Sequence, residues 1–446
     1  MRNIDKHPRP LLDAVGGVCS RFTMAAVAVL MVALPIVISP WGEDGYNQVK
    51  ALTMFALAGT ASLAWLGTRL IKGGPKWRST IPELAVWAFL LTVLLSSVTS
   101  VNPRLSYFGA PGRYEGLLAF ASYAALFFVG VHFFGSQQGM RSLAITAGVA
   151  AAMTAGYGIL QMFVRPLFRG EAFIRDWYGG LGMPRVPSTL GSPVVFGGYL
   201  SVMIPLLLAL AVLTVHWNRV LWLAAACLSY VAAVFTLTRA AWLGVAIGTV
   251  LAVGRGGRQF RPVVALAVVC AALVAGFILR TAVGSSAPVG GRMASVVDPS
   301  SGSLAQRLYI WDRTITLVRA KPWLGWGLET LGEVFPYDRP ALVKLFGVRP
   351  VIMDKAHNDV LQMAVSVGVP GALAYIAFWA GVVIAAVRLA RRESGSARIL
   401  AAGWLATIAA YLIQVQFSFS AVALAPIVWV FAGSAAGWEA SRTGAE

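Results

Sequence analysis

The chain alternates long apolar runs with short polar segments over most of its length. Each run is close to the roughly 20 residues that an α-helix needs to cross a bilayer. The pattern therefore predicts an all-α, polytopic membrane protein with about twelve transmembrane helices. The predicted spans cover residues 22–39, 49–71, 81–100, 114–134, 142–163, 194–215, 220–237, 240–254, 262–279, 369–388, 399–417 and 419–437.

The only long interval without an apolar run lies between the ninth and tenth spans, at residues 280–359. It collects many charged side chains and closes with Ala356-His357-Asn358-Asp359. A soluble-looking segment late among apolar helices is typical of a protein that presents a site on one side of a bilayer. We predict that residues 1–446 form a single integral membrane domain, in which residues 280–359 form an outer loop subdomain that carries the active site.

Local signals inside this outer loop predict a helix followed by a turn. Ser303 and Gln306 have the spacing of a capping box at a helix start. Pro322 disfavours helical geometry at the residue before it, so the helix is expected to stop there, and the Gly-rich run 323–327 is expected to turn. The apolar face predicted for this helix consists of Leu304, Leu308, Trp311 and Ile315.

Composition and charge placement both favour a membrane protein. The chain is 58% hydrophobic and only 12% charged, whereas the charged fraction of soluble domains is about twice as large. A net charge of +18 could suggest nucleic acid, but four basic segments fall on one side of the predicted spans. The positive-inside rule makes that side cytoplasmic, so both termini are predicted in the cytoplasm and the outer loop outside. The segments contain Arg2, Lys6, Arg9 and Arg21; Lys72, Lys76 and Arg78; Arg255, Arg258 and Arg261; and Arg388, Arg391, Arg392 and Arg398.

Shorter outer segments also carry charged candidates. Arg113 and Glu115 lie at the entrance of the fourth span, where they either anchor headgroups or contact a substrate. Arg185 belongs to a segment rich in arginine and aromatic residues, which suits contact with anionic lipid. Arg239 lies between the seventh and eighth spans with almost no loop. It therefore either snorkels to the headgroups or belongs to a functional site.

Several kinds of catalytic site lose support because their motifs are absent from the sequence. The chain has no His-Glu-x-x-His, no Asp-x-Asp, no Walker loop and no Gly-x-Ser-x-Gly. These absences argue against a zinc hydrolase, a nucleotide-driven pump and a triad hydrolase. The outer acidic residues are scattered, so no metal site is predicted either.

What the outer face offers instead is one histidine among many arginines. His357 lies at or just before a predicted helix that breaks at residues 368–371. A helix start favours a bound anion and lowers the pKa of a nearby imidazole, and a neutral imidazole can accept a proton. Arginine presents a planar fork of donors that matches phosphate oxygens. The combination predicts a general base beside a phosphate, with a structural histidine at a helix start as the alternative.

Several segments together resemble the signature of the O-antigen ligase and polymerase superfamily. The resemblance covers the second half of the chain well, while the first half is similar mainly in topology. The segments are Arg313 with Pro322-Trp-Leu-Gly325-Trp-Gly327; His357-Asn358-Asp359-Val-Leu361 with Gly368-Val-Pro370-Gly371; Thr238-Arg239-Ala-Ala-Trp242-Leu-Gly244; Thr189-Leu-Gly191-Ser-Pro193 up to Tyr199-Leu200; and Arg113-Tyr-Glu115-Gly116.

The resemblance implies an inverting glycosyltransferase of the GT-C type, which needs neither a metal nor a cofactor. Its donor would be a glycan on undecaprenyl diphosphate, at the outer face of a bacterial cytoplasmic membrane, and its partners would be that donor, a lipid or glycan acceptor and membrane lipids, with no nucleic acid. By position, His357 would be the catalytic base and Arg239 the diphosphate clamp. The substrate-binding candidates are Arg185, Arg307, Arg313, Arg113, Glu115 and Asn358.

The sequence leaves the acceptor open. Ligases of the superfamily transfer to a lipid A core sugar, polymerases to another lipid-linked repeat, and other relatives to protein or wall polymers. We favour a ligase. The alternative from a different class is a transporter for an anionic solute, but a transporter places polar groups near the bilayer midplane, whereas the charges here gather at the outer rim.

Overall fold

The computed structural model of the chain describes residues 10–39, 44–72, 80–161, 185–278, 302–346 and 352–443. Within these ranges every regular element is a helix, which confirms the all-α prediction. Each of the twelve predicted intervals forms a helix. These are α1 (Pro10–Ile36), α2 (Asn47–Lys72), α3 (Ile81–Val98), α5 (Leu117–Phe133), α6 (Gln137–Leu160), α8 (Pro193–Leu213), α9 (His216–Phe235), α10 (Arg239–Gly256), α11 (Phe260–Ile278), α16 (Asp359–Arg392), α17 (Gly395–Gln416) and α18 (Ala425–Thr443).

Length and hydropathy identify an integral membrane protein. In the described part of the chain, eight helices are long and apolar enough to cross a membrane: α1, α2, α3, α6, α8, α9, α16 and α17. Two shorter apolar helices, Leu117–Phe133 and Phe260–Gly276, coincide with further predicted spans. The count of twelve crossings stays a prediction.

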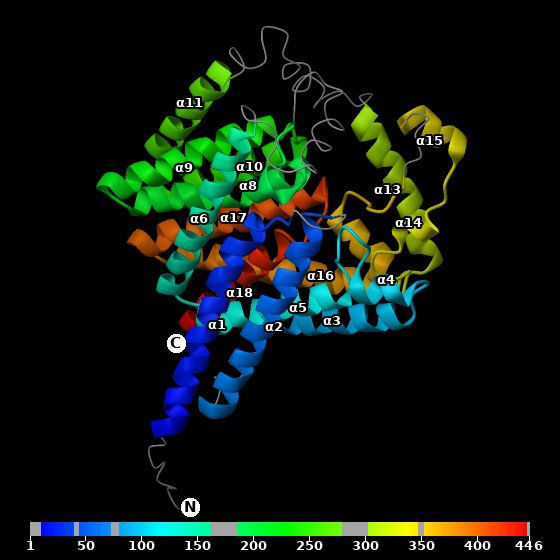
Figure 1. Ribbon diagram of the computed structural model, residues 1–446, viewed down its shortest axis with the longest axis horizontal. Helices are drawn as coiled ribbons and strands as arrows, with labels where there is room; N and C mark the ends of the chain where they lie inside the picture. Colours follow the sequence, from blue (N-terminus) through cyan, green and yellow to red (C-terminus); the bar gives the residue numbers. More distant parts are fainter. Residues whose placement is uncertain are drawn as a thin grey trace, which may run out of the picture.

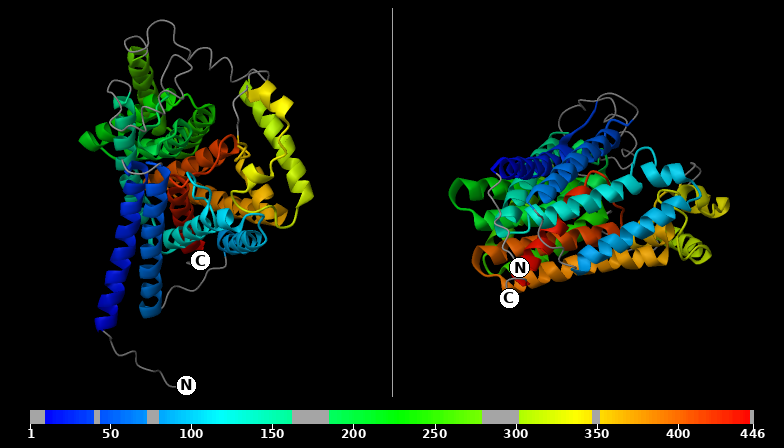
Figure 2. Two further views of the ribbon diagram at one scale, coloured as in Figure 1. Left: turned by 45° about the vertical axis from the view of Figure 1, so that its right-hand side comes forward. Right: turned by 90° about the horizontal axis from the view of Figure 1, so that it is seen from below.

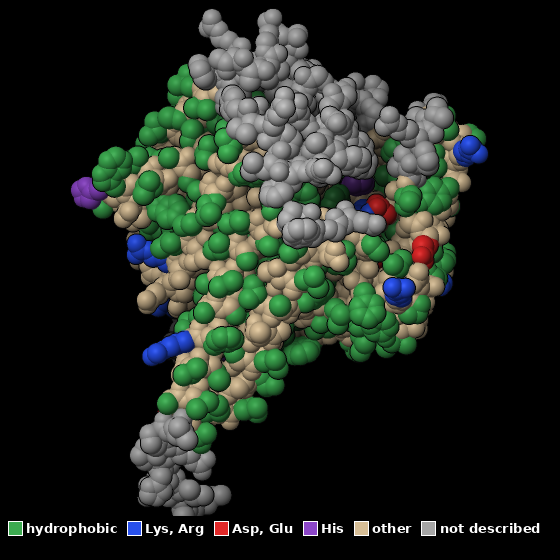
Figure 3. All heavy atoms as spheres, in the orientation of Figure 1, with side chains coloured by type: hydrophobic (Ala, Val, Ile, Leu, Met, Phe, Trp, Pro, Cys, Tyr) green, Lys and Arg blue, Asp and Glu red, His purple; other side chains and the backbone are tan. Residues whose placement is uncertain are grey.

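The bundle is built around α8, whose sequence is apolar on all sides. A helix of that kind is stable only when other helices or lipid surround it, and 89% of its apolar window is buried inside the protein. Helices α9, α10 and α17 pack around α8, α18 packs on α5, and α3 packs on α16. Helices α1 and α2 pair with each other and project beyond the rest of the bundle (Figure 1). The surface that Figure 3 shows is mostly hydrophobic or uncharged over its middle, with charged side chains toward its left and right ends, as expected for a belt that meets lipid.

Two of the basic segments predicted to share one side lie together. Arg398 Nε donates to Arg255 O at 3.1 Å, which joins the end of α10 to the start of α17. Arg442, near the end of α18, pairs with Glu393 in the α16–α17 connection. Arg2, Lys6, Arg9 and the stretch 73–79, which completes the other two basic segments, lie outside the described residues. That this end faces the cytoplasm stays a prediction.

The opposite end of the bundle carries the outer segments. Helix α4 (Pro103–Phe108), α13 (Gly302–Ala320), α14 (Leu331–Val334) and α15 (Arg339–Phe346) lie there, at the right of both views in Figure 2. Residues 280–301 of the predicted outer loop lie outside the described residues. Side chains from α13, α14, the segment before α16 and the start of α16 form a small apolar cluster of their own. It includes Ile310, Leu331, Met353, Val365 and Phe335, the residue that follows α14.

The predicted helix of the outer loop is confirmed to within about two residues at each end, and the face that packs against the protein differs from the predicted apolar face. Leu308 and Ile315 are exposed, whereas Ile310, Thr314 and Leu317 are buried. Helix α13 packs on α15 and α16, and its neighbours select a face slightly rotated from the one that spacing alone favoured. The expected capping box also fails at Gln306, whose Nε2 donates to Leu345 O at 2.7 Å instead of reaching back to the helix start.

The predicted turn at residues 323–327 docks on the predicted break at Gly368. Trp326 N and Gly327 N donate to Val365 O and Ser366 O, each at 2.9 Å. Gly368 has φ +78°, and a Cβ there would lie 2.2 Å from Trp323 O, so the contact requires glycine. Helix α16 kinks at Gly368 and then continues to Arg392. The kink fixes its first two turns, and with them the segment that carries His357.

Candidate active site

His357 immediately precedes the N-cap of α16, and its main chain is held on both sides. Asn358 is the N-cap residue, and its Oδ1 accepts from Leu361 N at 2.9 Å. Ala356 N donates to Gln362 Oε1 at 2.8 Å, and Ala356 O accepts from Trp311 Nε1 at 2.9 Å. His357 itself has φ +52°, a left-handed conformation that non-glycine residues rarely adopt and that often marks functional sites.

A small cavity adjoins His357. Its volume is about 10 Å³, room for roughly one water. The His357 ring lies 5.7 Å from the ring of Phe419, in the α17–α18 connection. The polar groups of the wall come from distant parts of the chain: Glu115, Glu329, Lys355, Asp359 and Ser420. The cavity is therefore a meeting point of segments, with too little room in this state for a sugar.

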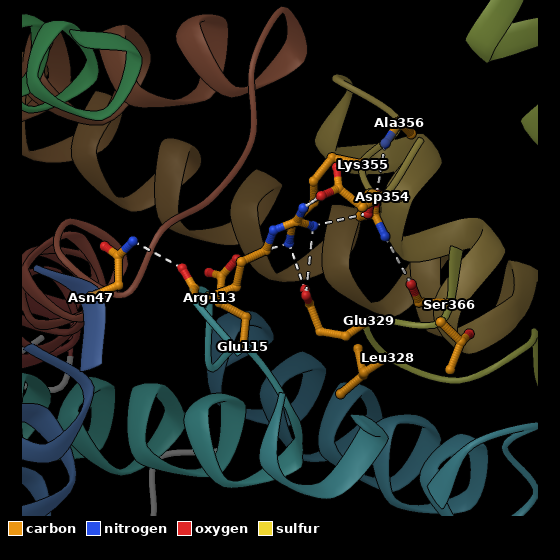
Figure 4. Close-up of polar contacts among 12 residues, drawn as sticks. Asn47, Arg113, Glu115, Leu328, Glu329, Asp354, Lys355, Ala356 and Ser366 are labelled. Atoms are coloured by element: carbon orange, nitrogen blue, oxygen red, sulfur yellow. Dashed lines mark hydrogen bonds and ion pairs between the residues drawn. The ribbon is translucent and has the colours of Figure 1, made fainter. Parts of the chain in front are cut away.

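Lys355 is the centre of a buried charge network on this wall. Its Nζ lies 3.0 Å from Glu115 Oε2 and 2.6 Å from Glu329 Oε1. The side chains of Lys355, Glu115 and Glu329 are only 6%, 4% and 3% exposed. Arg113 extends the network, because it contacts the Asp354 carboxylate and lies 3.7 Å from Glu329 Oε2 (Figure 4). A buried charge is stable only with such partners, so the five charged groups hold one another in place.

A third buried carboxyl group, Asp359, lines the cavity from the first turn of α16. It accepts a hydrogen bond from Tyr375 Oη. In the described part of the chain, no group of three or more His, Cys, Asp or Glu side chains is arranged to hold a metal ion. The carboxylates Glu115 and Glu329 are bridged by an ammonium group instead.

The surroundings of His357 favour its neutral form. Burial, followed by the positive charges of Arg307, Arg113 and Lys355, lowers the pKa of His357 to about 4. Burial acts on Lys355 in the same direction, but the charges of Glu329 and Glu115 outweigh it and raise the pKa of Lys355 overall. At neutral pH the imidazole is therefore uncharged and has a nitrogen available to accept a proton, although the cations beside it also make it a weaker base.

Two of the predicted arginines approach the site from other helices. Arg307, on α13, donates through Nη2 to Phe417 O at 3.0 Å. Burial and the nearby charge of Arg239 lower the pKa of Arg307, so the two guanidinium groups are close enough to repel. A pair of like charges brought together in this way favours a bound anion between or beside them.

Arg185 lies next to Arg239 and organises the α9–α10 connection. Its Nε donates to Thr236 O at 2.9 Å and its Nη2 to Thr238 Oγ1 at 3.0 Å. Leu237, between these two contacts, has φ +49°. Arg185 thus helps to hold a strained turn from which Arg239 starts α10.

Arg313 is the predicted residue that the contacts place elsewhere. It lies 4.0 Å from both Asp312 and Asp338, and its guanidinium lies over the ring of Tyr309. Arg307 and Arg313 are six positions apart, so they lie on different faces of an α-helix with 3.6 residues per turn. Asn358 is predicted to contact substrate, but its side-chain oxygen accepts the hydrogen bond that caps α16. The remaining predicted residues, Arg113, Glu115, Arg185, Arg239, Arg307 and His357, lie at the same end of the bundle.

The sequence analysis missed Lys355, Glu329 and Asp359 as site residues. The available signal was weak: Lys355 and Asp359 flank His357 within two positions, which could equally be a solvated loop. Glu329 has a positive φ (+61°), as His357 does, but no sequence pattern indicates that Glu329 belongs to the site.

A family model described as O-antigen ligase matches residues 223–376 of the chain. The matched region runs from α9 into α16 and includes Arg239, Arg307, Glu329, Lys355 and His357. No curated protein matches the chain.

Proposed function

Because this chain belongs to the O-antigen ligase superfamily, whose members are glycosyltransferase-like membrane enzymes, we propose that it transfers a glycan en bloc from undecaprenyl diphosphate. The proposed acceptor is a hydroxyl of a lipid A core sugar. The proposed place is the outer face of the bacterial cytoplasmic membrane, with both termini in the cytoplasm.

The observation that carries the proposal is a histidine near several cations at one end of a membrane bundle. His357 is half-buried near Arg307, Arg113 and Lys355, and their charges disfavour its protonated form. A base must start the reaction without its proton, and a diphosphate leaving group needs positive charge nearby. One cluster therefore meets both needs of a glycosyl transfer.

In the proposed reaction the acceptor hydroxyl gives its proton to His357. The oxygen attacks the anomeric carbon of the glycan and forms the new glycosidic bond. The bond from that carbon to the carrier diphosphate breaks, and the diphosphate departs with the electron pair. Attack opposite the leaving group inverts the anomeric configuration. Since the diphosphate is already a good leaving group, positioning and charge stabilisation supply the catalysis.

We assign the diphosphate to Arg239 and Arg307, whose charges already lie close to each other. Arg185 supports this pair by holding Thr236 and Thr238. Arg113 and Glu115 are tied into the network around Lys355, so we assign them to the frame of the site. Arg313 is engaged by Asp312 and Asp338, which makes it the weakest of the substrate candidates.

The test is a transfer assay with the purified full chain in lipid nanodiscs, in excess chelator, with a glycan on undecaprenyl diphosphate. Separate arms offer lipid A core, a second lipid-linked glycan and a hydroxyl-bearing peptide. The proposal expects product in the lipid A core arm, and none from the His357→Ala variant. Product only in the second arm identifies a polymerase, and product only in the third a protein glycosyltransferase. No product in any arm, with anion uptake by vesicles that contain the protein, identifies a transporter and refutes the proposal.

A further inference from the structure

The network around Lys355 joins three segments that are far apart in the chain. Glu115 comes from the connection between α4 and α5, Glu329 from the turn before α14, and Lys355 from the segment just before α16. Lys355 and Glu115 are 240 positions apart in sequence. The Lys355 ammonium therefore links the first half of the bundle, the outer segment and the start of α16.

Backbone strain collects around the same point. Tyr114, Glu329 and His357 all have a positive φ, at 60°, 61° and 52°. Each is a member of the network or lies within two positions of one. Non-glycine residues keep such conformations only where surrounding contacts hold them. The buried contacts of Lys355 add to the hydrogen bonds of Ala356 with Gln362 and Trp311 in holding the main chain before His357.

We propose that Lys355, bridged to Glu115 and Glu329, is a positioning residue that fixes His357 in its left-handed conformation and keeps its imidazole oriented toward the cavity. The inference rests on the proposed role of His357 as the base. It adds a residue that touches neither donor nor acceptor, and acts through the histidine two positions along the chain.

The charge of Lys355 has a second consequence for His357. A cation near an imidazole disfavours its protonation, so the bridge both places the base and keeps it uncharged. The charged groups that face His357 from the packed segments are Arg307 from α13, Arg113 and Glu115 from the α4–α5 connection, Glu329 from the turn before α14, Asp359 from α16, and Lys355 itself.

The experiment compares Lys355→Met with wild type by NMR of isotope-labelled histidine in the full chain in nanodiscs, with the His357 signal assigned by its loss in His357→Ala. Wild-type His357 is expected to titrate near pH 4. In Lys355→Met the midpoint should rise by roughly half a pH unit or less, because the charge of Lys355 is the smallest of the four causes that lower the pKa of His357. The transfer kcat should fall by roughly 10²-fold, as a base displaced by about 1 Å would require, with the donor KM little changed.

Two further variants separate position from charge. Glu329→Gln removes one side of the bridge and keeps the ammonium, so kcat should fall without a rise in the His357 midpoint. The control is Lys50→Met, which removes another fully buried lysine, one that donates to Leu34 O and Val37 O and contacts no site residue. It should leave the His357 midpoint and the kcat unchanged, even where thermal stability falls.

The inference is overturned when Lys355→Met keeps both the wild-type midpoint and the wild-type kcat, or when Lys50→Met raises the midpoint equally. If Lys355→Met does not fold, Glu329→Gln decides: an unchanged kcat in that variant refutes the positioning role. The titration needs no substrate. A chain that makes no glycan product but shows the midpoint rise would therefore refute the proposed function and leave the coupling of Lys355 to His357 standing.

Discussion

The two ends of the helix bundle both carry ion pairs, but they differ in burial. At the end where α18 stops, Arg442 lies 2.9 and 3.2 Å from the two oxygens of Glu393, and its side chain is 56% exposed. At the other end, the bridge of Lys355 to Glu115 and Glu329 is almost completely buried. Exposed pairs are screened by water and contribute little. A buried charge is costly to leave unpaired. The buried charges at the second end are therefore stable only because each has a partner of opposite charge.

The comparison shows that a count of charges cannot locate the site. The chain carries an excess of arginine and lysine at both ends, and the positive-inside rule accounts for one of them. What distinguishes the other end is that both partners of its ion pairs with Lys355 are buried. The predictions below test the contrast between the two ends, in order of decreasing effect.

The largest expected contrast is in accessibility from outside the cell. In a cysteine-free background, a cysteine at Ile352, which is exposed near His357, should react with a membrane-impermeant thiol reagent on intact spheroplasts. A cysteine at Arg392, exposed at the opposite end, should react only after the membrane is opened. The reverse pattern would place the candidate site in the cytoplasm.

Removal of the base should have the next largest effect. His357→Ala is expected to lose roughly 10² to 10⁴ in transfer rate, the usual contribution of general base catalysis. Donor binding should survive, as measured by titration with the lipid-linked glycan. A variant with a near wild-type rate would remove His357 from the mechanism.

Removal of the clamp should affect binding as well as turnover. Arg239→Ala is expected to weaken donor affinity by roughly tenfold to a hundredfold, the range for a lost hydrogen bond to a charged group. Arg239→Lys should restore only part of it, because an ammonium lacks the planar fork of donors. Equal losses of donor affinity in Arg239→Ala and His357→Ala would contradict the division of roles.

The smallest effect is expected at the exposed end. Arg442→Gln removes its pair with Glu393, which is worth less than about 1 kcal/mol for a half-exposed arginine. The transfer rate should stay within about twofold of wild type, and thermal unfolding should change little. A large loss of rate in Arg442→Gln would mean that the two ends are coupled, and would contradict the contrast between the exposed and the buried end.

The sequence predicted the helices well because each one must present about 20 apolar residues to lipid, a signal that survives without any knowledge of neighbours. It also indicated Arg239 and Arg113, which lie beside predicted spans, and His357, which precedes a predicted helix; Arg307 was indicated only by the family resemblance. It did not indicate Lys355 or Glu329, since their partners lie far away along the chain. It did not indicate the buried face of α13 for the same reason: that face packs on α15 and α16, and spacing within one helix does not contain that information.

The central claim is that His357 works as an uncharged base among cations, and the dependence of transfer rate on pH tests it most directly. Folding holds the pKa of His357 at about 4, below its usual 6.5, so the imidazole is neutral throughout the physiological range and gains a proton only in acid. With donor and acceptor saturating, the rate is predicted to stay level from about pH 6 to 8 and to fall on the acid side, as protonation removes the base. A rate that instead falls as pH rises through this range, with activity retained in His357→Arg, would mean that a protonated histidine binds the diphosphate, and would contradict the account.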